Sequence, residues 1–318
     1  MKKHSILLLK IILSAALLAY LLSKIPLDKI IDSAFSANPV LLLSGLFLVI
    51  PIIYLSAFET RYLTRIQGID LSTFEIIKIH LATSFYGLFL PGIISAGAVK
   101  WYKFSKYGGK SAAAAVVVFN RFLEILMTAF IGILFSLPVL YTIGDQKFFF
   151  MMILLVVLMI AFYVILFKKS EFNFPEKILL FIPLPAFLKN TARKFSGSMR
   201  QFNNLRLKDH LEIFGLLFLY HGIGIFSFLC FANSLNIDLS IWQIGWIRSA
   251  MALAIMLPLS FAGLGIREGT LVFILGYYGI QSDVSMALSF LFFSRNILTS
   301  AAGGMIELKD FIISKNYS

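Results

Sequence analysis

Apolar runs separated by short polar stretches make up most of the chain. Six of these runs are uninterrupted and cover about residues 5–25, 39–58, 112–139, 148–167, 211–235 and 284–306. A helix needs about 20 apolar residues to cross a hydrocarbon core of roughly 30 Å, and each run is about that long. A transmembrane barrel would alternate apolar and polar residues, which this chain does not. The pattern predicts an all-α polytopic membrane protein in which residues 1–318 form a single integral membrane domain.

Two further apolar stretches are interrupted in the same way. Residues 73–90 and residues 241–257 both end at the leucine of a Leu-Pro pair, and a basic residue follows nine positions after each proline. This residue is Lys100 in the first copy and Arg267 in the second. Helix breakers at matching places in the two halves of a membrane protein are typical of a substrate site. We expect the breaks to involve the prolines and nearby glycines, namely Pro91, Gly92, Gly97, Pro258, Gly263 and Gly265.

The net charge of +12 is concentrated in one segment. Residues 168–210 contain nine Lys or Arg and three acidic residues, and therefore half of the excess. Because cytoplasmic segments of membrane proteins are rich in Lys and Arg, we expect a cytoplasmic basic loop here and no nucleic-acid partner. The same rule predicts a plasma-membrane protein with cytoplasmic N- and C-termini. Within the loop, residues 187–206 place apolar and basic positions at helical spacing. This pattern favours an amphipathic helix on anionic inner-leaflet lipid, or one packed on the protein's own cytoplasmic face.

A lysine cluster constrains the topology further. If Lys103, Lys106 and Lys110 also face the cytoplasm, residues 73–107 must enter and leave the membrane on one side, as a re-entrant hairpin. Residues 241–281 then form a second hairpin that enters from the other side. The predicted fold has about six full spans and two re-entrant broken-helix hairpins, arranged as an inverted repeat of residues 1–140 and 148–306. The alternative is eight ordinary spans with the lysine cluster outside.

Ionisable residues inside the apolar runs are the first candidates for function, because each costs at least about 2.5 kcal/mol at the bilayer centre. Arg121 and Glu124 are three residues apart, so they share a helical face and can pair. Arg295 has no acid nearby in the sequence, and an anionic substrate would supply a partner. Arginine suits phosphate because its planar fork donates two parallel hydrogen bonds. We predict a substrate-binding set of Lys100, Arg121, Glu124, Arg267, Glu268 and Arg295.

Structural roles are the alternative for several of these positions. The Arg121–Glu124 pair would then only fix helix packing, and Lys100 would extend its ammonium to the interface. Arg248, His80 and His221 are further candidates with structural alternatives. Arg248 would then anchor a span end, and the two histidines would be hydrogen-bonded packing residues. Walker and hydrolase motifs are missing from the sequence, so we expect no metal, no cofactor and no enzyme activity.

Three motifs resemble one known family over nearly the whole chain. They are Leu90-Pro91-Gly92 with Gly97 and Lys100, Asn120-Arg121-Phe122-Leu123-Glu124, and Gly263-Leu264-Gly265-Ile266-Arg267-Glu268-Gly269. They are similar to the flippase-like transmembrane domain of lysylphosphatidylglycerol synthases. The resemblance implies movement of an aminoacylated phospholipid from the inner to the outer leaflet. In bifunctional members a separate soluble domain makes that lipid. Here the chain stops twelve residues after the last predicted span, so we do not expect lipid aminoacylation.

The sequence therefore predicts translocation of an anionic or aminoacylated phospholipid, or of a lipid-linked substrate, across the cytoplasmic membrane. The expected partners are membrane lipids, bound through their phosphate headgroups, and a homo-oligomer is an open possibility. Two alternatives stay open. One is a membrane-embedded transferase that uses a polyprenyl-phosphate donor, and the other is a non-transporting partner of an envelope enzyme.

Overall fold

The computed structural model describes residues 19–89, 93–139, 150, 153–154, 156–161, 164, 186–256 and 263–316. These residues form helices and the turns that join them, and they contain no strand. The prediction of an all-α polytopic membrane protein is confirmed. Much of the predicted spans 5–25 and 148–167 lies outside the described residues, as do Pro91, Gly92 and Pro258.

Within the described residues, four long apolar helices are able to cross a membrane. They are α3 (Pro39–Phe47) continued by α4 (Val49–Ile66), α7 (Lys110–Ser136) continued by the 3-10 turn η1 (Leu137–Val139), α12 (Leu207–Ser234) and α15 (Ser282–Asn316). Two of them extend past the predicted ends at residues 58 and 306. Those ends were placed before Glu59 and Glu307, the first acids after each apolar run. A helical backbone continues through such residues when their side chains find partners, as both do here.

The first long helix is interrupted at Leu48. Pro51 has no N–H to donate to the carbonyl of Phe47, and its ring crowds that carbonyl. The helix therefore ends at Phe47 and begins again at Val49. Beside this break, the Ser227 hydroxyl of α12 donates to the Gly45 carbonyl of α3 at 2.8 Å. The interrupted segment is thus tied to α12.

Four shorter helices form two pairs that match the interrupted stretches. They are α5 (Thr73–Phe89) with α6 (Ile93–Ser105), and α13 (Ile241–Met256) with α14 (Ile266–Gly276). Even α5, with 17 residues, is only about 25 Å long and shorter than a hydrocarbon core of roughly 30 Å. Between α13 and α14, Gly263 and Gly265 have φ of 78° and 81°, a conformation that favours glycine. Gly97 differs from its prediction, because it lies inside α6 and not in the first break.

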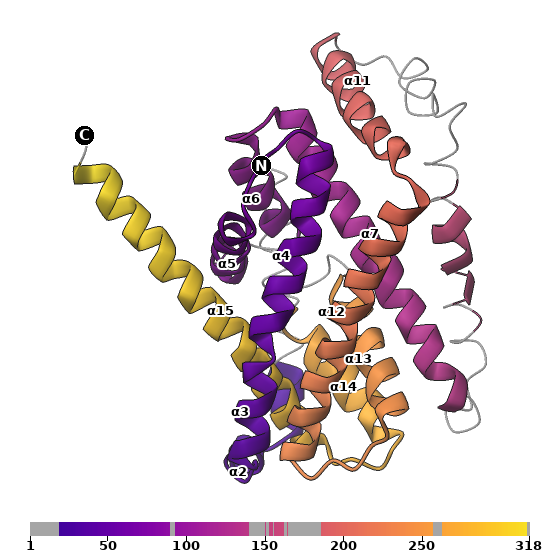
Figure 1. Cartoon of the computed structure of the whole chain (residues 1–318). Coiled ribbons are helices and arrows are strands. Elements are labelled where there is room, and N and C mark those ends of the chain that lie inside the picture. The colour runs from indigo at the N-terminus through magenta and orange to yellow at the C-terminus, as the bar shows by residue number, and fades with distance from the viewer. Residues whose placement is uncertain are drawn as a thin grey trace.

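The helices of the two halves of the chain pack on one another (Figure 1). From the first half, α7 packs on α13; from the second half, α15 packs on α5. The long helices α4 and α12 lie side by side between these contacts. The α15–α5 contact is close because Gly303 faces the Leu81 backbone, which a Cβ at that position would overlap. Small residues permit such close approach of helix backbones.

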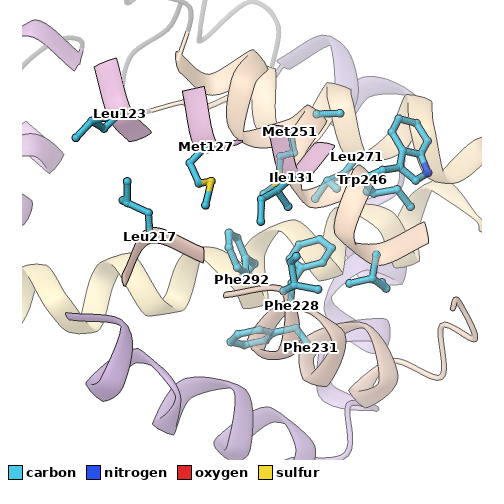
Figure 2. Close-up of a cluster of buried hydrophobic side chains, with 14 of the residues drawn as sticks. Leu123, Met127, Ile131, Leu217, Phe228, Phe231, Trp246, Met251, Leu271 and Phe292 are labelled. Atoms are coloured by element: carbon cyan, nitrogen blue, oxygen red, sulfur yellow. The ribbon is translucent and has the colours of Figure 1, made fainter. Parts of the chain in front are cut away.

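The apolar core lies where α7, α12, α13, α14 and α15 meet (Figure 2). Phe228 and Phe231 of α12 both pack edge-on against Phe292 of α15, with ring centroids 5.0 and 5.8 Å apart. Edge-to-face aromatic pairs in this distance range add stability beyond the area they bury. Side chains of α7, α13 and α14 complete the cluster, among them Leu123, Met127, Ile131, Met251 and Leu271.

The predicted amphipathic helix is α11 (Ala186–Gln201), followed by the 3-10 turn η2 (Phe202–Asn204). Phe202 is 1% exposed and stacks on Phe119 of α7, with ring centroids 4.3 Å apart. Gln67 Nε2, just after α4, donates to the Ser198 carbonyl of α11 at 2.7 Å. The end of α11 is therefore packed on the protein itself, as one of the two alternatives predicted. Arg193 and Lys194 are exposed, so contact with anionic lipid stays a prediction.

Candidate functional site

A chain of hydrogen bonds links three polar residues inside the helix bundle. Lys100 Nζ of α6 donates to Asn120 Oδ1 of α7 at 2.8 Å, and Asn120 Nδ2 donates to Glu59 Oε2 of α4 at 2.8 Å. Glu59 is 2% exposed and Asn120 is buried with it. A lone charge is costly to bury. The Asn120 amide here bridges one ammonium and one carboxylate, so that each buried charge has a polar partner.

Arg121 and Glu124 form the pair expected from their spacing on α7. Arg121 Nη1 lies 3.0 Å from Glu124 Oε2. Glu124 also borders a narrow cavity together with Glu59 and with Tyr220 of α12. The Lys100 ammonium is within electrostatic range of both carboxylates. The pair is therefore continuous with the Lys100–Asn120–Glu59 chain.

Two more arginines approach this region from the second half of the chain. Arg248 of α13 places Nη1 3.4 Å from His221 Nδ1. The Arg248 guanidinium fits against α12 because the facing residue of that helix is Gly224. A Cβ at this position would overlap the guanidinium. Arg248 lies mid-helix and is buried, so it does not anchor a span end as the sequence alternative had it. Arg295 of α15 lies over the Phe292 ring, 4.4 Å from its centroid.

Tyr220 is the residue that joins the two groups. Its hydroxyl lies within electrostatic range of Glu124, Arg248, Arg295 and Arg121. Within the described residues, Arg248 Nε and Arg295 Nη1 are buried and have no hydrogen-bond partner. Buried polar groups normally have one, so these two N–H groups are candidates to donate to a bound acceptor.

Arg267 and Glu268 form a cluster of their own at the start of α14. The Arg267 guanidinium is ion-paired with Glu268 and donates from Nε to Ser289 Oγ of α15 at 2.8 Å. Glu268 Oε2 accepts the backbone N–H of Gly265 at 2.7 Å, which caps the helix. Both side chains are almost fully buried. These contacts hold the break between α13 and α14 against α15. The charges of Arg267 and Glu268 neutralise each other.

The buried charges do not balance. Arg121 and Arg267 each pair with an acid, and Lys100 reaches one through Asn120. Arg248 and Arg295 form no ion pair with any acid in the described part of the chain. Two positive charges are therefore uncompensated beside Tyr220. Since buried charges are normally paired, this region is suited to receive an anion.

Cavities lie along the contact of α12 with the α3–α4 segment, here called the α4–α12 interface. At one end is a cavity of about 630 Å³ whose polar lining includes Tyr62, Arg65, Arg206 and Asp209. The narrow cavity of Glu59, Glu124 and Tyr220 is next along the helices, and it has no room for a water molecule. Beyond it lies an apolar groove of about 280 Å³, lined by Leu48, Phe218, Leu219, Gly222, Ile223 and Phe226.

A family model for the transmembrane region of lysylphosphatidylglycerol synthases matches residues 7–304. The chain belongs to this family. Comparison with curated proteins and with solved structures gives no significant match. The resemblance carried by the sequence motifs is confirmed, and the match covers both interrupted stretches, three of the four long helices in full and α15 as far as residue 304. A membrane-associated family and four membrane-capable helices together make this a multi-pass membrane protein.

The structure of this family member brings some of the predicted site residues together and adds others. Lys100, Arg121 and Glu124 lie in one network, and Arg295 is within electrostatic range of Tyr220, which borders the same cavity as Glu124. Arg267 and Glu268 instead form the separate cluster with Ser289. Sequence reasoning missed Glu59, Asn120 and Tyr220, and it missed the burial of Arg248. A signal for both Glu59 and Asn120 was present, because Glu59 directly follows the apolar run 39–58 and Asn120 is a polar residue inside the run 112–139.

Proposed function

We propose that this protein moves a lipid with an anionic phosphate headgroup across the membrane, and that Arg248 and Arg295 bind the phosphate. The observation that carries the proposal is the pair of arginines, Arg248 buried and Arg295 partly buried, that have no acidic partner among the described residues. Arginine forks donate parallel hydrogen bonds to phosphate oxygens, and two of their N–H groups are unpaired here. Family membership supports a lipid over a small soluble anion.

The other predicted residues have different roles in this proposal. Arg121, with Glu124, lies within electrostatic range of Tyr220 and supplies a second contact for the phosphate or for an aminoacyl amine. Lys100 is held by Asn120 and contributes positive potential. Arg267 and Glu268 fix the second break so that α13 and α15 hold their arginines in place. A phosphodiester and a polyprenyl-linked phosphate both present anionic phosphate oxygens, so the proposal covers both classes of lipid.

We also infer that the chain is an inverted repeat, and reciprocal packing supports this. If residues 1–140 and 148–306 are equivalent, α5 corresponds to α13 and α7 to α15. The contact of α7 with α13 then has its counterpart in the contact of α15 with α5, and α6–α7 corresponds to α14–α15. A pseudo-two-fold axis would pass through the α4–α12 interface. Transporters built this way place the substrate at the interface of the repeats.

The cavities along the α4–α12 interface provide a route for such a lipid. Acyl chains stay in the bilayer beside the apolar groove of Phe218 and Phe226, while the headgroup passes the narrow cavity of Glu59, Glu124 and Tyr220. Because this cavity has no room for water, the conformation is closed, and the headgroup enters only when α4 and α12 separate. In this proposal the end that carries α11 faces the cytoplasm of the plasma membrane, as the positive charge of residues 168–210 predicts.

Leaflet exchange in proteoliposomes tests the proposal. Vesicles would contain purified protein and phosphatidylglycerol with a fluorescent headgroup, and a membrane-impermeant quencher would report the outer-leaflet fraction over time. We expect Arg295→Ala to lower the exchange rate roughly tenfold or more, because one charge-assisted contact contributes about 1.5–3 kcal/mol. Lys309→Ala, which removes an exposed cation from α15, is the matched control. Equal rates for Arg295→Ala and wild-type protein would show that the assignment of the phosphate site is wrong.

A further inference from the structure

No cation in the described part of the chain contacts the Glu59 carboxyl group directly, in contrast to the Glu124 and Glu268 carboxyl groups. Oε2 accepts from Asn120 at 2.8 Å and from Thr60 at 3.4 Å, but Oε1 is buried and finds no hydrogen-bond partner among the described residues. Glu124 and Glu268, by contrast, contact an arginine directly. A carboxylate has about four acceptor positions, and an unpartnered oxygen disfavours the ionised form far more than the neutral form.

Charged and titratable groups from every neighbouring helix surround Glu59. From α6 comes Lys100, which reaches it only through the Asn120 amide. From α7 come Arg121 and Glu124, already paired with each other. His80 of α5 contacts Ser56, one helical turn from Glu59, and Tyr220 of α12 borders the same cavity. The neighbours thus include a second carboxylate and no cation in direct contact, an arrangement that suits a group that gains and loses a proton.

We propose that Glu59 binds a proton and couples proton movement to the movement of the anionic lipid, an inference that rests on the proposed function. Protonation removes one of the two negative charges within electrostatic range of Lys100, so the site gains one positive charge. A more positive site binds the phosphate more tightly, and by linkage the bound phosphate makes Glu59 take up a proton more readily. Proton and lipid anion therefore cross in the same direction. The proton comes from water when the cavity opens and returns to water on the other side.

A transport experiment separates coupling from transport itself. Proteoliposomes with labelled phosphatidylglycerol would be assayed with and without a pH gradient, with the membrane potential clamped by potassium and an ionophore. In wild-type protein we expect movement of the lipid away from the acidic side to be roughly fivefold or more faster with the gradient than without it. In Glu59→Gln this ratio should fall to one, and in Glu59→Asp, which keeps a carboxyl, the ratio should stay above one.

The outcomes distinguish the two proposals. Exchange that is present in wild-type protein but equal with and without the pH gradient would overturn the coupling and leave the proposed function standing. A response to a sodium gradient in place of the pH gradient would also overturn it, since the bound cation would then be a metal ion. Complete absence of lipid exchange in the wild-type protein would instead count against the proposed function.

Infrared titration of the purified protein gives a readout that needs no transport. A protonated carboxylic acid has a carbonyl band that a carboxylate lacks, and we expect one such band to titrate in wild-type protein and to be lost in Glu59→Gln. Glu75→Gln is the control, because Glu75 lies near water at the start of α5, where hydrogen bonds from Ser72 lower its pKa. A spectrum in which Glu59→Gln matches the wild type would show that Glu59 takes up no proton.

Discussion

Replacing Asn120 by Leu removes the hydrogen-bonded bridge between the partly buried Lys100 and the buried Glu59. Leu is of similar size but has no donor or acceptor, so Lys100 and Glu59 each lose a hydrogen bond of 2.8 Å while they stay inside the bundle. A hydrogen bond to a charged group contributes about 1.5–3 kcal/mol, and two of them therefore about 3–6 kcal/mol. Breaking a buried ion pair costs about 3–5 kcal/mol, which agrees with this range.

The single cysteine provides the assay for this variant. Cys230 lies in α12 and is 8% exposed, so a fluorogenic maleimide reacts with it only as the helix bundle opens. Heating the detergent-solubilised protein with this reagent gives an apparent melting temperature. Soluble domains of 150–250 residues lose roughly 2–4 °C per kcal/mol. We therefore expect Asn120→Leu to melt at least about 6 °C below the wild type.

Two further variants decide whether the loss comes from the charges. Asn190→Leu makes the same change at an exposed position of α11 and should leave the melting temperature unchanged. The triple variant Glu59→Gln, Asn120→Leu and Lys100→Met removes both charges and should recover most of the stability, because neutral side chains carry no large desolvation cost. If Asn120→Leu melted within about 2 °C of the wild type, or if the triple variant melted lower still, the bridge between the two charges would not be what stabilises this region.

Three other substitutions test the packing. Gly303→Val places a side chain against the Leu81 backbone, which cannot move alone. We expect about 1–3 kcal/mol of destabilisation in the same thermal assay. An unchanged melting temperature would contradict the close α5–α15 contact. Gly224→Ala displaces the flexible guanidinium of Arg248 and should slow lipid exchange with little effect on melting, whereas unchanged exchange would show that the position of this arginine does not matter. Phe202→Ala removes a buried ring that fixes α11, at about 3–5 kcal/mol, and should expose the α11 segment to proteolysis; wild-type resistance would refute that role.

The helices could be predicted from the sequence because their signals are local. Apolar runs of about 20 residues indicated α7, α12 and α15, and the Leu-Pro pairs marked where α5 and α13 end. The predicted positions of the helix ends were less accurate. Glu59 and Glu307 interrupt the apolar pattern, but the helical backbone hydrogen bonding continues past both residues. Gly97 was assigned to a break for the same reason: glycine disfavours a helix but does not end one that has tertiary contacts.

The candidate site depends on contacts that no local pattern contains. Arg295 was identified because an arginine far from any acid in an apolar run needs a partner from elsewhere. That Arg248 would lie in the same region depends on Gly224, 24 residues away on another helix. The role of Asn120 depends on two side chains, 20 and 61 residues away in sequence. Sequence reasoning thus indicated which charges needed partners, whereas the fold determines which partners they have.

Two hydrogen bonds close the α4–α12 interface at its opposite ends. At the end that carries α11, Tyr62 of α4 donates its hydroxyl to Asp209 of α12 at 2.5 Å. At the other end, Ser227 donates to Gly45. Asp209 and Ser227 are 18 residues apart on one helix, or about 27 Å, and the cavity beside Tyr220 lies between them. A headgroup that reaches this cavity from one side needs to break only the nearer hydrogen bond. The farther one keeps the interface closed, so that in the proposed cycle the two leaflets are never open to the site at once.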